Sequence, residues 1–239
     1  MLKFFRKIRR SLLEQKKSGV YLRYALGEIF LVVIGILIAL SINNWNEERK
    51  EKATTRVYIE NLKSDIFQDS TVLNFLIETG DRHQKIIGEF KSYLVDSDHT
   101  LSEKVDSSLK LQVYFYRYLP FNQTYLDMQS SGSSKLLNQE QRSILNKLTG
   151  MQSIIVNTNQ TFISWAIGEL ANRNQYIDEY RLVSKVTGQS STPEELKLFL
   201  RHQLNYLYRM ENMGRTLSRF AKDAKEFSKE AILKLEEEL

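Results

Sequence analysis

The stretch that decides how this chain is arranged is YALGEIFLVVIGILIALSI, which runs from Tyr24 to Ile42. Its centre, Ile29 to Leu40, holds twelve apolar residues in a row. At a rise of about 1.5 Å per residue, a helix made from the whole stretch spans roughly 28 Å, close to the hydrocarbon thickness of a bilayer. The sequence therefore predicts a transmembrane helix over residues 24–44.

The residues near the ends of this stretch fit a membrane span. Tyr24 and Trp45 bracket it, at the depths where amphipathic aromatic rings settle in the membrane interface. Glu28 is its single charged residue, and it lies one turn from the end, where a carboxylate can reach water. We expect Glu28 to reach towards water or to bond to another helix, although an acid inside a span is also a candidate for proton coupling.

Two other interpretations fit a short apolar run. The residues Ala39-Leu40-Ser41 resemble the small-residue site at which a secretory signal peptide is cleaved. Twelve apolar residues also suit a buried helix of a soluble domain. We prefer an uncleaved anchor, because the sequence from Ile42 onward continues as helix and the segment before the apolar centre is long for a signal peptide.

Charge predicts the orientation of the span. One acid, Glu14, precedes it together with eight basic residues, whereas acids and bases nearly cancel just after Trp45. The positive-inside rule places residues 1–23 in the cytoplasm as a basic segment and residues 45–239 outside it, which in a bacterial inner membrane is the periplasm. The expected partners of the basic residues are anionic lipid headgroups and not nucleic acid. These residues are Lys3, Arg6, Lys7, Arg9, Arg10, Lys16, Lys17 and Arg23.

Composition favours helices for the rest of the chain. Of 239 residues only 2 are Pro and 10 are Gly, and this scarcity of helix breakers favours long helices over a sheet. About 190 residues follow the span, enough for one domain with its own core. The chain has no Cys, which excludes a disulfide and a thiolate metal site.

A heptad-like seam follows the predicted span. Its apolar residues recur at alternating steps of three and four, and an acid, a glycine and a histidine complete the register. The pattern predicts one long helix, packed nearly parallel to its partners and ending near residues 96–99. The seam positions are Ile59, Leu62, Ile66, Asp69, Leu73, Leu76, Gly80, His83, Ile87, Phe90 and Leu94.

Two shorter helices are expected next. A capping box at Thr100–Glu103 starts a helix that is expected to run towards Tyr118 and to end at Pro120. A second helix is expected over residues 123–129, and Gly132 can take the left-handed conformation after it.

The C-terminal half is expected to form two long helices. Asn138 caps the first, which we expect to run to about Val186, with a kink or a wetter patch at the polar run Asn157–Thr161. Thr192 and Pro193 start the second, whose apolar residues keep a seven-residue period to the end. A short turn separates the two, so they must be antiparallel. The predicted fold class is all-α: a transmembrane helix that continues into an elongated antiparallel helical bundle.

No pattern typical of an enzyme emerges from the sequence. The histidines His83, His99 and His202 have no partner at metal-ligand spacing. The sequence has no nucleophile elbow, no phosphate-binding glycine loop and no zinc-binding helix. We therefore expect a protein that is not an enzyme and that holds no cofactor and no metal.

The aromatic-rich stretch around Pro120 is the remaining candidate site. In a structural interpretation, its rings form the core of a cap at the membrane-distal end of the bundle. In a functional interpretation, the rings and the polar loop Asn122–Ser134 form a recognition surface or a small-ligand pocket, because aromatic side chains are enriched in both. The candidate residues are Tyr116, Tyr118, Phe121, Thr124, Tyr125, Ser130, Ser131 and Gly132.

Two blocks of the sequence resemble a known family. They are GEIFLVVIGILIALSINNWNE, from Gly27 to Glu47, and TYLDMQSSGSSKLL, from Thr124 to Leu137. The chain is similar here to an uncharacterised bacterial family of small single-span membrane proteins, catalogued as a domain of unknown function. The resemblance implies an N-terminal span and an all-helical outer domain, and it implies no activity.

These observations favour a non-enzymatic, single-pass module that binds or spaces a partner in a cell-envelope assembly. The partner is expected to be another protein or a second copy of the chain. The alternative is a sensory or ligand-binding periplasmic domain, which must work through a partner because the first 23 residues hold no output domain. A less favoured alternative is a proton-coupled subunit that uses Glu28.

Overall fold

The computed structural model describes residues 18–96, 98–177 and 182–237, and all regular structure in these ranges is helical. This confirms the all-α fold class. Most of the predicted basic segment, residues 1–17, lies outside the described residues. The described helices are α2 (Ser18–Val95), α3 (Leu101–Leu109), α4 (Gln123–Ser130), the 3-10 helix η1 (Ser133–Leu136), α5 (Gln139–Arg173), α6 (Leu182–Thr187) and α7 (Pro193–Glu236).

The chain divides into two compact units, residues 1–56 and residues 57–239. In the first unit, helix α2 carries the predicted span, and all its large apolar side chains from Leu26 to Ile42 except Ile34 are exposed. A helix that is apolar all round is stable only when protein or lipid covers it. Among the described residues, none of the most apolar part of this stretch is buried, and the helix is long and apolar enough to cross a membrane.

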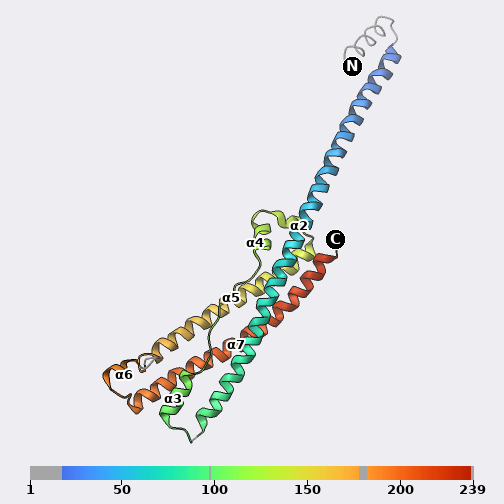
Figure 1. Ribbon diagram of the computed structural model, residues 1–239. Helices are drawn as coiled ribbons and strands as arrows, with labels where there is room; N and C mark the ends of the chain where they lie inside the picture. Colours follow the sequence, from blue (N-terminus) through green and yellow to red (C-terminus); the bar gives the residue numbers. More distant parts are fainter. Residues whose placement is uncertain (1–17, 97, 178–181, 238–239) are drawn as a thin grey trace. The chain divides into compact units, whose positions relative to one another are not determined.

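The second unit is a bundle in which the later part of α2 lies beside α5 and α7 (Figure 1). The predicted seam of α2 faces the inside of this bundle: every seam position from Ile59 to Phe90 is buried, and Leu94 is partly buried. The interior therefore contains Asp69, Gly80 and His83 as well as apolar residues.

The two C-terminal long helices begin where the sequence predicts. Capping boxes join Asn138 to Gln141 at the start of α5 and Thr192 to Glu195 at the start of α7. Each box satisfies backbone N–H groups that a helix start otherwise leaves without partners. Two pairs of contacts show that the helices are antiparallel. Glu140 and Lys234 pair at one end, and Glu169 and His202 pair near the other.

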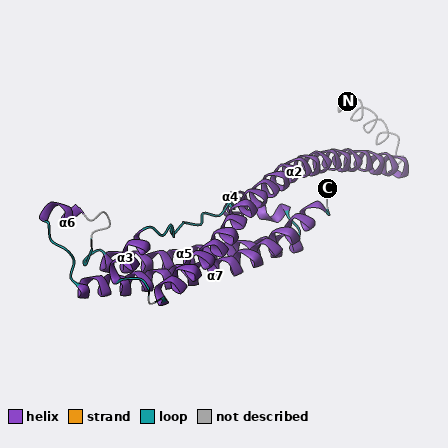
Figure 2. Cartoon of the chain, turned by 60° about the horizontal axis from the view of Figure 1, so that its bottom comes forward, coloured by secondary structure: helices purple, strands orange, loops and turns teal. Residues whose placement is uncertain are grey.

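The predicted helix after residue 100 is much shorter than expected. It ends at Leu109 as α3, and residues 110–122, which we call the connecting segment, contain no helix. Figure 2 shows this segment as a teal trace along the side of the bundle, from α3 to α4. Val113 and Tyr118 of this segment are buried, whereas Tyr114, Phe115, Arg117 and Leu119 are exposed. The prediction of a helix towards Tyr118 was wrong, because tertiary hydrogen bonds hold this part extended.

The predicted long helix from Asn138 to Val186 was also wrong at its C-terminal end. Helix α5 ends at Arg173, where a turn closes with the N–H of Tyr176 bonded to the carbonyl of Arg173. A separate short helix, α6, follows. The run Asn172 to Gln175 contains polar residues that favour turns over a continued helix.

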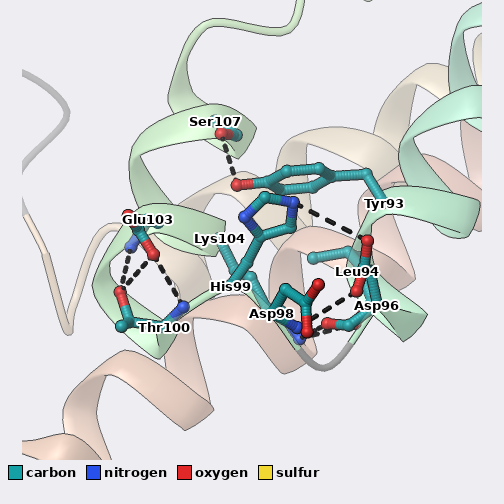
Figure 3. Close-up of polar contacts among 9 residues, drawn as sticks. All are labelled: Tyr93, Leu94, Asp96, Asp98, His99, Thr100, Glu103, Lys104 and Ser107. Atoms are coloured by element: carbon teal, nitrogen blue, oxygen red, sulfur yellow. Dashed lines mark hydrogen bonds and ion pairs between the residues drawn. The ribbon is translucent and has the colours of Figure 1, made fainter.

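The corner between α2 and α3 is held by polar side chains (Figure 3). Lys104 Nζ donates to the carbonyl oxygens of Leu94 and Asp96 at 2.9 and 2.7 Å, and so satisfies groups that the end of α2 leaves open. Thr100 and Glu103 form the predicted capping box of α3. The corner is therefore fixed by charge-assisted and capping hydrogen bonds.

Candidate functional site

The middle of the connecting segment is bound to α5 by the amide side chain of Asn159. Asn159 Nδ2 donates to the carbonyl of Tyr116 at 2.9 Å, and Asn159 Oδ1 accepts from the N–H of Tyr118 at 3.0 Å. Asn159 lies in the polar run for which the sequence predicts a wetter patch. The side chain is itself buried and serves as a hydrogen-bonding partner for the backbone.

Asp69 of α2 is the centre of a buried polar network under the same segment. Its Oδ1 accepts from the hydroxyl of Tyr118 at 2.9 Å and from the N–H of Phe121 at 3.1 Å. Its Oδ2 accepts from Gln152 Nε2 at 2.8 Å, and Gln152 Oε1 accepts from Asn122 Nδ2 at 2.8 Å. The network joins α2, α5 and the connecting segment.

The Asp69 carboxyl group has no cation beside it: among the described residues, no ion pair includes it. Burial therefore raises the pKa of Asp69, while its hydrogen bonds from Gln152, Tyr118 and Phe121 act in the opposite direction. The neighbouring Asp65 adds a smaller raising effect. A buried carboxylate that accepts three donors is suited to fixing a chain segment in place.

Asp65 performs a related task one turn earlier in α2. Its Oδ2 accepts from the N–H of Thr124 at 2.9 Å, within the first turn of α4. The N-cap residue of α4, Asn122, makes no side-chain capping bond because its amide is bonded to Gln152. The cap thus comes from another helix, and a carboxylate at this place also suits the helix dipole.

The structure separates the predicted recognition residues into buried and exposed groups. Tyr118 and Tyr125 are buried, so their side chains belong to the core. The Tyr125 hydroxyl also donates to Asn146 Oδ1 at 2.9 Å. Tyr116 and Thr124 are partly buried. The exposed residues are Phe121, Ser130, Ser131 and Gly132.

The polar loop behaves locally as predicted. Gly132 has a φ of 74°, the left-handed conformation expected after the short helix. The aromatic residues, however, do not form a cap at the end of the bundle. Tyr118 contacts Asp69, and Tyr116 contacts Phe75, both of them well before α2 ends at Val95. The expectation failed because the segment runs back along the bundle.

Three buried polar side-chain atoms in the described part of the bundle have no hydrogen-bond partner. They are Thr79 Oγ1, His83 Nδ1 and the hydroxyl oxygen of Tyr116. Thr79 and His83 lie one turn apart on α2, and the ring of Tyr116 lies 6.2 Å from that of His83, between centroids. Burial raises the pKa of Tyr116 to about 12. Unsatisfied polar groups in an interior are unusual and mark this place as a second candidate site.

Acid is expected to destabilise the bundle through His83. Burial lowers the pKa of this histidine, and Arg82 adds to the effect. An unfolded histidine has a pKa of about 6.5, so below that pH the unfolded chain binds a proton that the folded chain rejects. The free energy of unfolding should therefore fall as the pH drops from about 6.5.

The measurement is urea unfolding of the wild type and of His83→Leu between pH 7.5 and 5.5. The wild type should lose more stability over this range than the variant. His99→Gln is the matched control, since His99 lies partly exposed at the α2–α3 corner. An equal pH dependence in the wild type and His83→Leu contradicts the assignment.

The other candidates from the sequence are a metal site and Glu28. Among the described residues, no group of three or more His, Asp or Glu side chains is placed to hold a metal ion. Glu28 lies in the apolar part of α2, in the first unit.

Sequence reasoning placed Asp69 on the seam but did not identify its partners. The signal was an acid at a core position of an apolar repeat together with a polar run at Asn157–Thr161. Neither pattern indicates that Asp69 and Asn159 bind the connecting segment. Their partners include backbone groups of that segment, for which the sequence predicted a helix.

Comparisons with known proteins bear on the family alone. The model of a family described as "Family of unknown function (DUF6090)" matches residues 28–161, which is more than half of the chain. The match covers the apolar part of α2, the seam, the connecting segment and Asn159. Neither curated proteins nor solved structures gave a match to the chain.

Proposed function

Since the chain belongs to the DUF6090 family, a family of unknown function, we propose its role from its own structure: a membrane-anchored helical module that binds a protein partner outside the cytoplasm. The proposal takes the module to be non-enzymatic. The same proposal places it in a bacterial inner membrane, with residues 1–23 inside and the bundle in the periplasm.

One observation carries this proposal. A single helix, Ser18–Val95, contains both the apolar stretch and the buried seam of the bundle. An anchor that continues without a break into the first helix of a folded domain ties that domain to the membrane surface. This supports a tethering or binding role better than the role of a freely diffusing protein.

The orientation can be tested by labelling, because the chain has no cysteine. Ser191→Cys, at an exposed position before α7, should react with a membrane-impermeant maleimide in spheroplasts. Ser11→Cys should react only after the membrane is lysed. The reverse pattern overturns the orientation, and a mature protein that begins near Ile42 overturns the anchor.

The partner can be tested by formaldehyde crosslinking of the full chain in cells, followed by mass spectrometry. A defined protein, or a second copy of the chain, should be recovered in stable proportion. A protein that is solitary under all conditions contradicts the proposal.

A second candidate is a ligand-binding input domain. The unpartnered atoms of Thr79, His83 and Tyr116 favour it, since a small polar molecule or water can satisfy buried donors and acceptors. Thermal unfolding of the detergent-solubilised full chain against a metabolite library tests this candidate. A stabilising compound whose effect is lost in Tyr116→Phe supports it, and the absence of any stabilisation contradicts it.

A further inference from the structure

The connecting segment presents one unpaired edge of extended chain. Asn159 bonds to the carbonyl of Tyr116 and to the N–H of Tyr118, as one residue of a neighbouring strand does in a parallel ladder. Because successive residues of an extended chain direct their backbone groups to opposite sides, the N–H and carbonyl of Arg117 point away from α5. We take Phe115 and Leu119 to continue this edge on either side of Arg117. It extends no further, because the carbonyl of Val113 accepts from the hydroxyl of Tyr206 and the N–H of Phe121 donates to Asp69.

This outward edge is free of partners. Among the described residues, nothing bonds to the backbone of Phe115, Arg117 or Leu119, and all three are exposed. Leu119 is 67% exposed. Phe75 of α2 packs edge-on against the Tyr116 ring and remains 50% exposed. An apolar ring therefore lies beside a row of open hydrogen-bonding groups.

The charge of this edge is entirely positive. Between Lys110 and Leu126 the sequence contains two basic residues, Lys110 and Arg117, and no acid. Arg117 lies at the centre of the free edge, with Phe115 and Leu119 on either side. The surface therefore complements an acidic, partly apolar chain, and an exposed strand edge is the feature that such extended chains bind.

We propose that the outward edge of residues 115–119 is the docking surface of the protein partner, which adds an extended segment with an acidic side chain next to Arg117. This inference rests on the proposed partner-binding function and specifies its surface. Main-chain hydrogen bonds give the affinity, while Phe75, Phe115 and Leu119 give apolar contacts. The acid opposite Arg117 sets the register.

The experiment uses the full chain in cells, with a photo-crosslinking amino acid at Leu119. The control carries it at Tyr208 of α7, which is 61% exposed. Position 119 should give an adduct at least ten times stronger than position 208, and the captured peptide should contain Asp or Glu.

Two variants then test the strand pairing and the charge complementarity. Phe115→Pro removes an outward N–H, and Arg117→Glu reverses the charge; each should lower the yield at least tenfold.

Both variants must unfold at the wild-type temperature, and Phe115→Ala, which keeps the N–H, should lose less of the adduct than Phe115→Pro. An adduct at 119 that survives both variants overturns strand pairing. An adduct between two copies of this chain overturns the assignment of a different protein. A partner captured only at position 208 overturns the assignment of residues 115–119 as the docking surface, but it remains consistent with the proposed partner-binding function. The absence of an adduct at either position, together with no formaldehyde adduct, contradicts both.

Discussion

Replacing Asp69 by alanine is expected to lower the free energy of unfolding by about 3–5 kcal/mol, because each buried donor left without a partner costs about 1–3 kcal/mol. The variant leaves two buried donors, the hydroxyl of Tyr118 and the amide of Gln152, and one partly buried donor, the N–H of Phe121, without an acceptor. The desolvation cost of the two buried donors therefore remains.

Urea unfolding of the detergent-solubilised chain, followed by far-UV circular dichroism, measures this loss. Asp81→Ala is the matched control, because Asp81 is exposed on the same helix, and a change within about 0.5 kcal/mol is expected there. If both variants lose the same small amount, the network does not hold the connecting segment.

Asp69→Asn should retain much more stability than Asp69→Ala. An asparagine oxygen still accepts from Tyr118 and Phe121, and its new amide is accommodated when the amides of Gln152 and Asn122 turn over. Burial raises the pKa of Asp69, so the folded state favours the protonated carboxyl, and the stability it contributes is lost as the pH rises from about 3.8 through the folded pKa. Asn imitates the neutral form. The free energy of unfolding of Asp69→Asn, relative to that of the wild type, should therefore rise from acidic to neutral pH.

The long helices could be predicted because their signals are local and repeated. The seam of α2 and the start of α7 at Thr192–Pro193 follow from spacing and capping, and the structure places both as expected. Each depends on residues within one or two turns. Met210, Leu217 and Ala224 are among the buried positions of α7 that follow from the seven-residue period.

The connecting segment was mispredicted because its conformation depends on distant residues. A run of aromatic residues with one capping box at Thr100 is compatible with a helix up to Pro120. The non-helical conformation is instead determined by Asn159 and Asp69, which bond to backbone groups of the segment. Tertiary contacts of this kind override local propensity.

The site was predictable only as a list of residue types. The aromatic stretch drew attention to Tyr118 and Tyr125, but both are buried with their hydroxyls bonded. The exposed residues beside them, Phe115, Arg117 and Leu119, became candidates for a docking edge only through the direction of the backbone. That direction comes from the hydrogen bonds of Asn159, which no spacing rule reveals.

Gly80→Ala is expected to destabilise the bundle by about 2–3 kcal/mol, the upper part of the usual range for an overpacked core. A Cβ at Gly80 falls 2.6 Å from the carbonyl oxygen of Gly214, and a Cβ at Gly214 falls 3.0 Å from the Cα of Gly80. Helices α2 and α7 thus touch backbone to backbone at this crossing. Neither obstacle is a side chain that can turn aside, so one helix must move and disturb the packing on both sides.

Gly88→Ala is the control that decides whether space or helix propensity dominates. Gly88 lies on the same helix, and a Cβ added there has nothing within 4 Å. The better helix propensity of alanine should therefore stabilise the bundle by about 0.5–1 kcal/mol. The same substitution eight residues apart is therefore expected to change the urea midpoint in opposite directions. Two shifts of the same sign refute a backbone contact at Gly80, because helix propensity acts equally at both positions and only the approach of Gly214 distinguishes them.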